Sequence, residues 1–281
     1  MSAPYRQPDI TGQLGPQLKQ WRTVRGTSQL ALSLESGVSQ RHISFIESGR
    51  SMPGRATLLA LAQVLDVPFR ERNTLLLAAG YAPMYADRDW NDEDMRGIEK
   101  AIARMLKQQN PYPAIVMDRY WNVLMANDAA PRFFNRFVDL DARPAPRNIL
   151  ALMFDPAGMR PHIANWEQVA ASLLQRVGRE SVGRFADHKT QELIASLLAF
   201  PDVDKHWPAV AGAHATEGLP MVPFSFIKNG AVMNYFSMIT FVAAPQNIAA
   251  QELRVECMFP ADQETEELHT QLMQVVSEQE I

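Results

Sequence analysis

Apolar residues in the first eighty positions recur at helical spacing between small polar turns. The pattern predicts helices over about 14–25, 28–35, 40–48, 55–65 and 69–79. Ser28 and Ser39 are suitable N-caps, and Gly37 supplies a turn residue that accepts a positive φ. We expect a compact helical bundle in which the second helix buries Leu30, Ala31 and Leu34.

The pattern changes after about residue 82. A polar, acidic stretch is followed by a predicted helix from Met95 to Gln109, and then by two apolar runs that read as strands. The strands are expected at Ala114–Met117 and Val123–Ala126, with a turn at Asp118–Trp121. Helical patterns dominate from Ala129 to Leu198, with breaks near two proline-containing segments.

The last third of the chain has β character again. Asn229-Gly230 between apolar runs predicts a hairpin. The segment "ELRVECMF" alternates, so we expect one face, carrying Arg254, Glu256 and Met258, to meet solvent. A final amphipathic helix is predicted over Gln263–Val276.

These elements predict an α+β chain with an all-α helix-turn-helix bundle followed by a mixed α/β sensor domain. We expect a disordered arm at 1–12, the bundle at 13–82, a linker at 83–94 and the sensor domain at 95–281.

Charge is distributed unevenly between the two parts. Residues 1–80 hold nine Lys+Arg and five Asp+Glu, a net +4, and the remainder holds 18 and 26, a net −8. A basic first part suits contact with phosphate. The chain has a single cysteine, Cys257, which excludes an intrachain disulfide and a thiolate metal cluster. With no signal-like or membrane-spanning stretch, we expect a cytoplasmic protein without membrane contact.

The third predicted helix has the polar outer edge that reading of a DNA major groove requires. Gln40 can bond adenine and Arg41 can bond guanine, while Phe45 can contact a thymine methyl group. Gln29 opens the preceding helix, where free N–H groups favour a phosphate. The candidate DNA-binding residues are Gln29, Ser39, Gln40, Arg41, His42, Ser44, Phe45, Arg50 and Arg55. A polar helical hairpin with a solvated surface is the alternative for any one of them.

The segment "LSLESGVSQRHISFIESGRSMP" resembles the Xre (Cro/C1-type) helix-turn-helix family. Gln29, Ser39, Gln40, Ile43, Glu47 and Gly49 fall on that pattern. The resemblance implies that Glu47 makes a structural contact within the domain. Gly54 departs from the serine that relatives usually carry, but glycine is a permissive N-cap.

More narrowly, "SQRHISFIESGRSMP" and "ERNTLLLAAGYAPMY" resemble the MmyB-like regulators. The similarity continues through "NPYPAIVMDRYWNVLMAN", "RNILALMFDPAGMRPHIANWEQVAASLL" and "ELRVECMFPAD". It implies a PAS-like sheet covered by helices, an internal apolar cavity and a fatty acid as the ligand class. No further cofactor is implied.

Large apolar residues and the 14 methionines suit an adaptable pocket for a flexible chain. The candidate wall residues are Trp121, Leu124, Phe133, Phe134, Met153, Phe154, Trp166, Phe224, Phe226, Phe236 and Met238. Arg160, His162 and Asn165 are candidate donors to a ligand carboxylate. At sheet spacing, however, such apolar residues are more often ordinary core.

We therefore interpret the chain as a DNA-binding transcriptional regulator, expected to be a homodimer because one helix-turn-helix reads a half-site. Its partners would be an operator duplex and a small apolar ligand. The alternative is a C-terminal domain that serves as a dimerisation or protein-interaction platform with a filled core. An enzyme is disfavoured, because the sequence has no GxxxxGK, GxGxxG or GxSxG motif and its six histidines are scattered.

Overall fold

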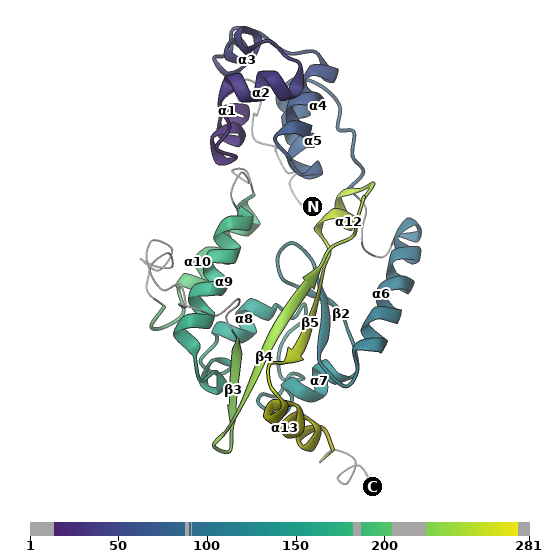
Figure 1. Ribbon diagram of the computed structural model, residues 1–281, viewed down its shortest axis with the longest axis vertical. Helices are drawn as coiled ribbons and strands as arrows, with labels where there is room; N and C mark the ends of the chain where they lie inside the picture. Colours follow the sequence, from purple (N-terminus) through teal and green to yellow (C-terminus); the bar gives the residue numbers. More distant parts are fainter. Residues whose placement is uncertain (1–13, 88–89, 91, 182–186, 204–222, 275–281) are drawn as a thin grey trace, which may run out of the picture. The chain divides into compact units, whose positions relative to one another are not determined.

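The computed structural model describes residues 14–87, 90, 92–181, 187–203 and 223–274, and these divide into two compact units (Figure 1). The first unit takes the described residues of Met1–Asp89 together with Pro245–Gln251. The second takes most of the remainder. The predicted N-terminal arm and the last two residues of the predicted final helix lie outside the described residues. No described helix is both long and apolar enough to cross a membrane.

The first unit is built from short capped helices. They are α1 (Leu14–Val24), α2 (Gln29–Ser36), α3 (Gln40–Glu47), α4 (Arg55–Val64) and α5 (Phe69–Ala78). Ser28 accepts a hydrogen bond from the Ala31 N–H at 3.0 Å, and Ser39 accepts one from His42 N–H at 3.2 Å. Gly37 ends α2 at φ 71°. The predicted helices and caps are confirmed, with boundaries that differ by a residue or two.

The buried face of α2 differs from the prediction. Leu30 and Leu34 are 55% and 78% exposed, while Leu32 is completely buried. Leu30 and Leu34 are one turn apart and share a face, and Leu32 points away from them. Because α2 packs on α3 and α4, those neighbours select the face that carries Leu32.

At Gly15 the backbone of α1 comes into close contact with the backbone at the end of α3. A Cβ atom at this position would lie 2.6 Å from the Glu47 carbonyl oxygen and 2.7 Å from that of Ile46. Glycine is therefore required by the close approach, and it places α3 against α1.

The second unit contains an antiparallel sheet that is five-stranded in the described residues and has the order β2-β1-β5-β4-β3. Its strands are β1 (Ala114–Met117), β2 (Val123–Ala126), β3 (Phe224–Lys228), β4 (Ala231–Thr240) and β5 (Arg254–Pro260). Asn229 and Gly230 join β3 to β4 with φ angles of 51° and 82°, as the predicted hairpin requires. The predicted positions of β1 and β2 are confirmed.

Helices cover the sheet and complete the α+β fold (Figure 1). They are η1 (Glu93–Met95), α6 (Arg96–Gln109), α7 (Ala129–Phe134), α8 (Ile149–Phe154), η2 (Arg160–His162), α9 (Trp166–Ser181), α10 (His188–Leu198) and α13 (Gln263–Gln274). One hydrophobic core joins α7, α8 and α9 to the inward side chains of β1, β3 and β4. A short helix that the sequence analysis missed, α12 (Ile248–Glu252), interrupts the connection between β4 and β5.

A buried polar contact fixes α13 to the sheet. The His269 Nδ1 lies 2.8 Å from the Tyr235 hydroxyl, and its Nε2 lies 3.0 Å from the Pro111 carbonyl oxygen. Burial lowers the pKa of His269. A neutral ring satisfies both contacts by accepting from the tyrosine and donating to the carbonyl.

The prediction that Arg254, Glu256 and Met258 face solvent was wrong. Arg254 is 4% exposed, and Glu256 and Met258 are half-buried and line a cavity. Strand β5 lies between β1 and β4, and the inward face of these strands is covered by helices. The polar face of β5 is therefore turned inward.

Candidate functional site

Helix α3 has a buried apolar face and an exposed polar edge. Ile43 and Ile46 are 0% and 1% exposed and hold the helix in the bundle. Ser39, Gln40 and Arg41 are exposed at its N-terminal end. This arrangement leaves the first turn of α3 accessible to base edges, as a recognition helix requires.

Unpaired positive charge surrounds this edge. The guanidinium carbons of Arg41 and Arg50 lie 5.3 Å and 6.0 Å from the centre of the Phe45 ring. Arg41, Arg50 and Arg55 are exposed, and within the described residues none of them pairs with a carboxylate. By contrast, Arg22 and Arg25 form ion pairs. The free arginines are therefore available for phosphate oxygens or guanine.

Glu47 ties the helices of the motif together. The Arg22 Nε donates to the Glu47 carboxylate at 2.6 Å, and the Gln29 amide donates to it at 2.7 Å. The structural contact that the Xre resemblance implies for Glu47 is confirmed. Gln29 thus holds α2 against α3, and its phosphate contact remains a prediction. His42, Ser44 and Phe45 are half-buried on the same helix.

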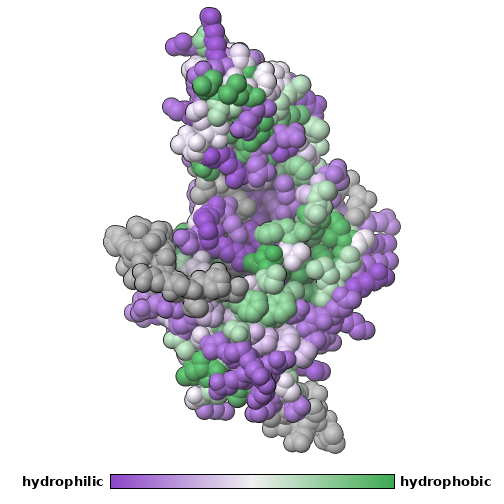
Figure 2. Space-filling model, viewed as in Figure 1, coloured by the Kyte–Doolittle hydropathy of each residue, from purple (hydrophilic) through white to green (hydrophobic). Residues whose placement is uncertain are grey.

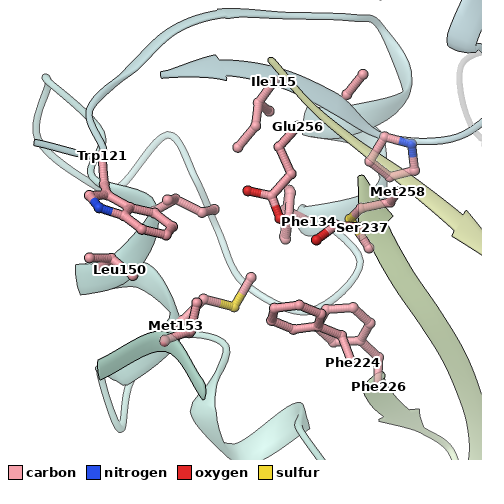
Figure 3. Close-up of a pocket in the computed structure, with 14 residues that line it drawn as sticks. Ile115, Trp121, Phe134, Leu150, Met153, Phe224, Phe226, Ser237, Glu256 and Met258 are labelled. Atoms are coloured by element: carbon pink, nitrogen blue, oxygen red, sulfur yellow. The ribbon is translucent and has the colours of Figure 1, made fainter. Parts of the chain in front are cut away.

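The second unit encloses an apolar cavity of about 40 Å³ (Figure 3). Its walls come from β1 and its flanking residues, α7, α8, α9 and the three strands β3, β4 and β5. The described lining residues are Pro113, Ala114, Ile115, Trp121, Phe134, Ile149, Leu150, Met153, Leu173, Phe224, Phe226, Ser237, Glu256 and Met258.

Five of the predicted wall residues line this cavity. They are Trp121, Phe134, Met153, Phe224 and Phe226. Four other predicted wall residues lie outside the described lining. Phe133 and Phe154 are completely buried in the core, Trp166 packs on Phe154, and Leu124 is a half-buried residue of β2.

Phe236 and Met238 require a correction of a different kind. Both alternate with Tyr235 and Ser237 along β4, so they lie on the opposite face of the sheet from the cavity. Phe236 stacks on Phe259, and Met238 is 58% exposed. Apolar residues occur on both faces of β4, so the sequence did not indicate which face is covered by helices.

The predicted carboxylate donors are also absent from the described lining. Arg160 donates to the Pro201 carbonyl oxygen and pairs with Asp202. Asn165 bonds the backbone of Pro223 and Ser225, and so attaches the start of α9 to β3. The His162 ring lies 5.4 Å from that of Phe137.

Two polar lining residues, Ser237 and Glu256, escaped the sequence analysis. They occupy strands that pair with each other, and their oxygens point into the cavity (Figure 3). The sequence did contain a signal for Glu256, because a glutamate stands inside the largely apolar segment "RVECMF". The alternation of that segment, taken alone, placed this glutamate on the face expected to meet solvent.

Trp121 forms one wall of the cavity and is held between two cations. The guanidinium carbons of Arg176 and Arg254 lie 4.3 Å and 5.5 Å from its ring centre. Arg254 also donates to Glu180 at 2.5 Å. The indole is therefore positioned by contacts to α9 and β5. A displacement of the Trp121 ring would alter its contacts with both elements.

Arg119, two residues before Trp121 in the chain, is the centre of a buried ion-pair cluster. Arg119, 3% exposed, donates to Asp187 at 2.7 Å and to Glu252 at 2.5 Å. Although burial opposes ionisation, the bond from Thr190 and the charge of Arg119 hold the pKa of Asp187 below its ordinary value. The cluster connects the β1–β2 turn to the end of α12 and the start of α10.

Residues that could hold a metal ion are not grouped in the described parts of the chain, where no set of three His, Cys, Asp or Glu side chains converges. Separately, the described lining of the cavity is apolar except for Ser237 and Glu256, which suits an organic apolar ligand.

Two protein families match the chain. The helix-turn-helix family matches residues 18–72, and the MmyB-like transcription regulator ligand binding domain matches residues 98–272. A comparison with curated proteins found no match. Both families are regulatory ones and neither is enzymatic. The chain belongs to the MmyB-like transcription regulators and is a DNA-binding regulator with a ligand-binding domain.

Proposed function

We propose that this regulator responds to a small apolar effector, a fatty acid or a closely related acyl-chain molecule, bound in the cavity of a PAS-like second unit. The observation that carries the proposal is the cavity itself, whose described lining is apolar except for Ser237 and Glu256. An acyl chain gains about 0.8 kcal/mol for each buried CH₂ group.

The cavity must expand to hold such a ligand. Its volume of about 40 Å³ suffices for a few water molecules, whereas small-molecule pockets typically measure about 300–1,000 Å³. Met153 and Met258 are flexible side chains in the wall and can move aside. Binding is therefore expected to displace wall residues. Trp121, which contacts Arg176 on α9 and Arg254 on β5, can transmit such a displacement to both elements.

The connection between β4 and β5 offers a route from effector to DNA. Residues Pro245–Gln251 belong by their contacts to the first unit, although β5 follows directly in the chain. Gln251 accepts a hydrogen bond from the Phe69 N–H at 2.7 Å, and Ile248 N–H donates to Ala86 at 3.1 Å. A shift of β5 is thereby linked to α5, and an effector that favours one position changes DNA affinity by linkage.

We further propose that the regulator acts in the cytoplasm as a homodimer on an operator with two half-sites. Apolar surface gathers over strands β4 and β5 (Figure 2). Met238 and Phe241 are 58% and 57% exposed in this part of the chain. The same surface is the basis of the alternative function, in which the second unit is a protein-interaction platform without a small-molecule ligand.

Native mass spectrometry of the full chain, followed by footprinting on a promoter library, tests the proposal. We expect a co-purifying acyl ligand, and a change in operator protection when that ligand is extracted and restored. Met153→Trp fills the cavity and should abolish the bound mass. The matched control Met105→Trp, on the surface of α6, should retain it.

Two results would refute the proposal. Absence of any acyl-chain ligand, together with no binding of an added fatty acid, long-chain alcohol or long-chain amine, would favour the interaction-platform alternative. A protein that protects no sequence in either state would contradict the regulatory function.

A further inference from the structure

The polar lining of the cavity is acidic. Glu256 pairs across the sheet with Ile115 on β1 and with Ile239 on β4, so its lateral neighbours are aliphatic. Along β5, Arg254 and Met258 share its face. Figure 3 shows the carboxylate pointing into the cavity beside the hydroxyl of Ser237. No arginine, lysine or histidine belongs to the described lining.

The Glu256 carboxylate has neither a hydrogen-bond nor an ion-pair partner in the described parts of the chain. Arg254, the basic residue on the same face of β5, is engaged elsewhere. It donates to Glu180 at 2.5 Å and to the Asp118 carbonyl oxygen at 3.1 Å. A half-buried carboxylate facing an apolar cavity is stabilised by any donor that enters the cavity.

We propose that Glu256 recognises the head group of the effector by accepting a hydrogen bond from it. The effector is then an apolar chain that carries a donor, a hydroxyl or an amino group, with Ser237 as a second polar contact. This inference rests on the proposed function of the cavity and specifies its ligand class.

A carboxylate head is disfavoured by the same geometry. An ionised acid would bring a second negative charge next to Glu256, with no cation in the described lining to offset it. An acyl-chain acid is therefore accepted in its protonated form, in which it also donates, and the corresponding alcohol or amine binds better near neutral pH.

Calorimetric titration of the delipidated full chain with 1-decanol, decylamine and decanoate tests this assignment near neutral pH, where decanoate is ionised. We expect the alcohol and the amine to bind at least about tenfold more tightly than decanoate, because a hydrogen bond to a charged group contributes this much. Glu256→Gln should reduce the ratio to near one. The control Glu264→Gln removes an equal charge from the exposed start of α13 and should leave the ratio unchanged.

The outcomes separate this inference from the proposed function. If wild type binds all three probes equally, or prefers decanoate, the role of Glu256 is refuted while the cavity stands. Retention of the preference in Glu256→Gln refutes it as well. If wild type binds none of the probes, the proposed effector site fails and this inference fails with it. Should Glu256→Gln not fold, the order of the three probes in wild type decides alone.

Discussion

Single residues set the geometry of the DNA-binding unit, and Gly15 is the clearest example. Its missing side chain lets α1 approach the Ile46 and Glu47 carbonyl oxygens. The Arg22–Glu47 pair and the Gln29 bond then fix α3 from the other side. The direction of Gln40 and Arg41 thus depends on residues of α1 and α2 that hold α3 in place.

Gly15→Ala is expected to lower the free energy of unfolding of the first unit by about 1–3 kcal/mol, the usual cost of overpacking. The clash involves backbone atoms, which cannot rotate away, and it outweighs the gain in helix propensity of about 0.5–1 kcal/mol. Denaturant unfolding of the full chain, followed by operator binding, measures both effects.

Gly178→Ala in α9 is the matched control, since a Cβ atom there meets nothing within 4 Å. It should leave the second unit as stable or slightly more stable. An unchanged first unit in Gly15→Ala would contradict the close approach of α1 and α3.

At the scale of elements, α3 combines a buried anchor and an exposed reading edge within eight residues. Base specificity is expected to reside in its first turn. Arg50 and Arg55, which follow α3 in the chain, are expected to supply affinity that does not depend on sequence. Recognition and general attraction to DNA are thus assigned to different residues.

Gln40→Ala and Arg41→Ala are each expected to lose about 1–3 kcal/mol of discrimination between operator and altered sites. Fluorescence anisotropy with the footprinted operator and with single-base variants measures this loss. Arg104→Ala removes a charge from the exposed face of α6 and should bind the operator like wild type. If both α3 variants also keep their specificity, the assigned reading edge is wrong.

Strand β5 also has two faces with different surroundings. One face carries Arg254, which positions Trp121, and Glu256, which points into the cavity. The other face carries Val255, Cys257 and Phe259. Burial and the charge of Glu256 raise the pKa of Cys257 and keep its thiol protonated. We therefore expect its role to be packing.

At the scale of the whole molecule, the chain passes between its two units more than once. The connection from β4 to β5 contributes Gln251 to the N-terminal end of α5, where Pro68 provides no side-chain cap. A bond made by a residue 182 positions away along the chain thus completes a helix of the DNA-binding unit.

Gln251→Ala is expected to reduce the factor by which effector changes operator affinity, because it removes the bond that links this connection to α5. It should also cost about 1 kcal/mol of stability, as the loss of a helix cap does. Operator affinity measured with and without the extracted ligand tests the coupling. Gln251→Glu retains an acceptor that suits a helix N-terminus and should restore it. Full coupling in Gln251→Ala would exclude this route.

Much of the local structure could be predicted from the sequence. The caps Ser28 and Ser39, the turn at Gly37, the strands β1 and β2 and the Asn229-Gly230 hairpin depend on a few adjacent residues. Their helical and strand periodicities are local properties of the chain. The resemblance to the MmyB-like regulators also came from contiguous motifs.

Tertiary structure alone decided which face of each element is buried. Leu32 rather than Leu30 and Leu34 enters the core because α3 and α4 lie on its side. Glu256 faces a cavity because β5 lies between β1 and β4, strands far from each other in the chain. Alternation separates two faces of a strand, but only the elements packed on them determine which face meets water. For that reason the sequence by itself determined most of the elements and the DNA-reading motif, and the tertiary structure decided the lining of the cavity.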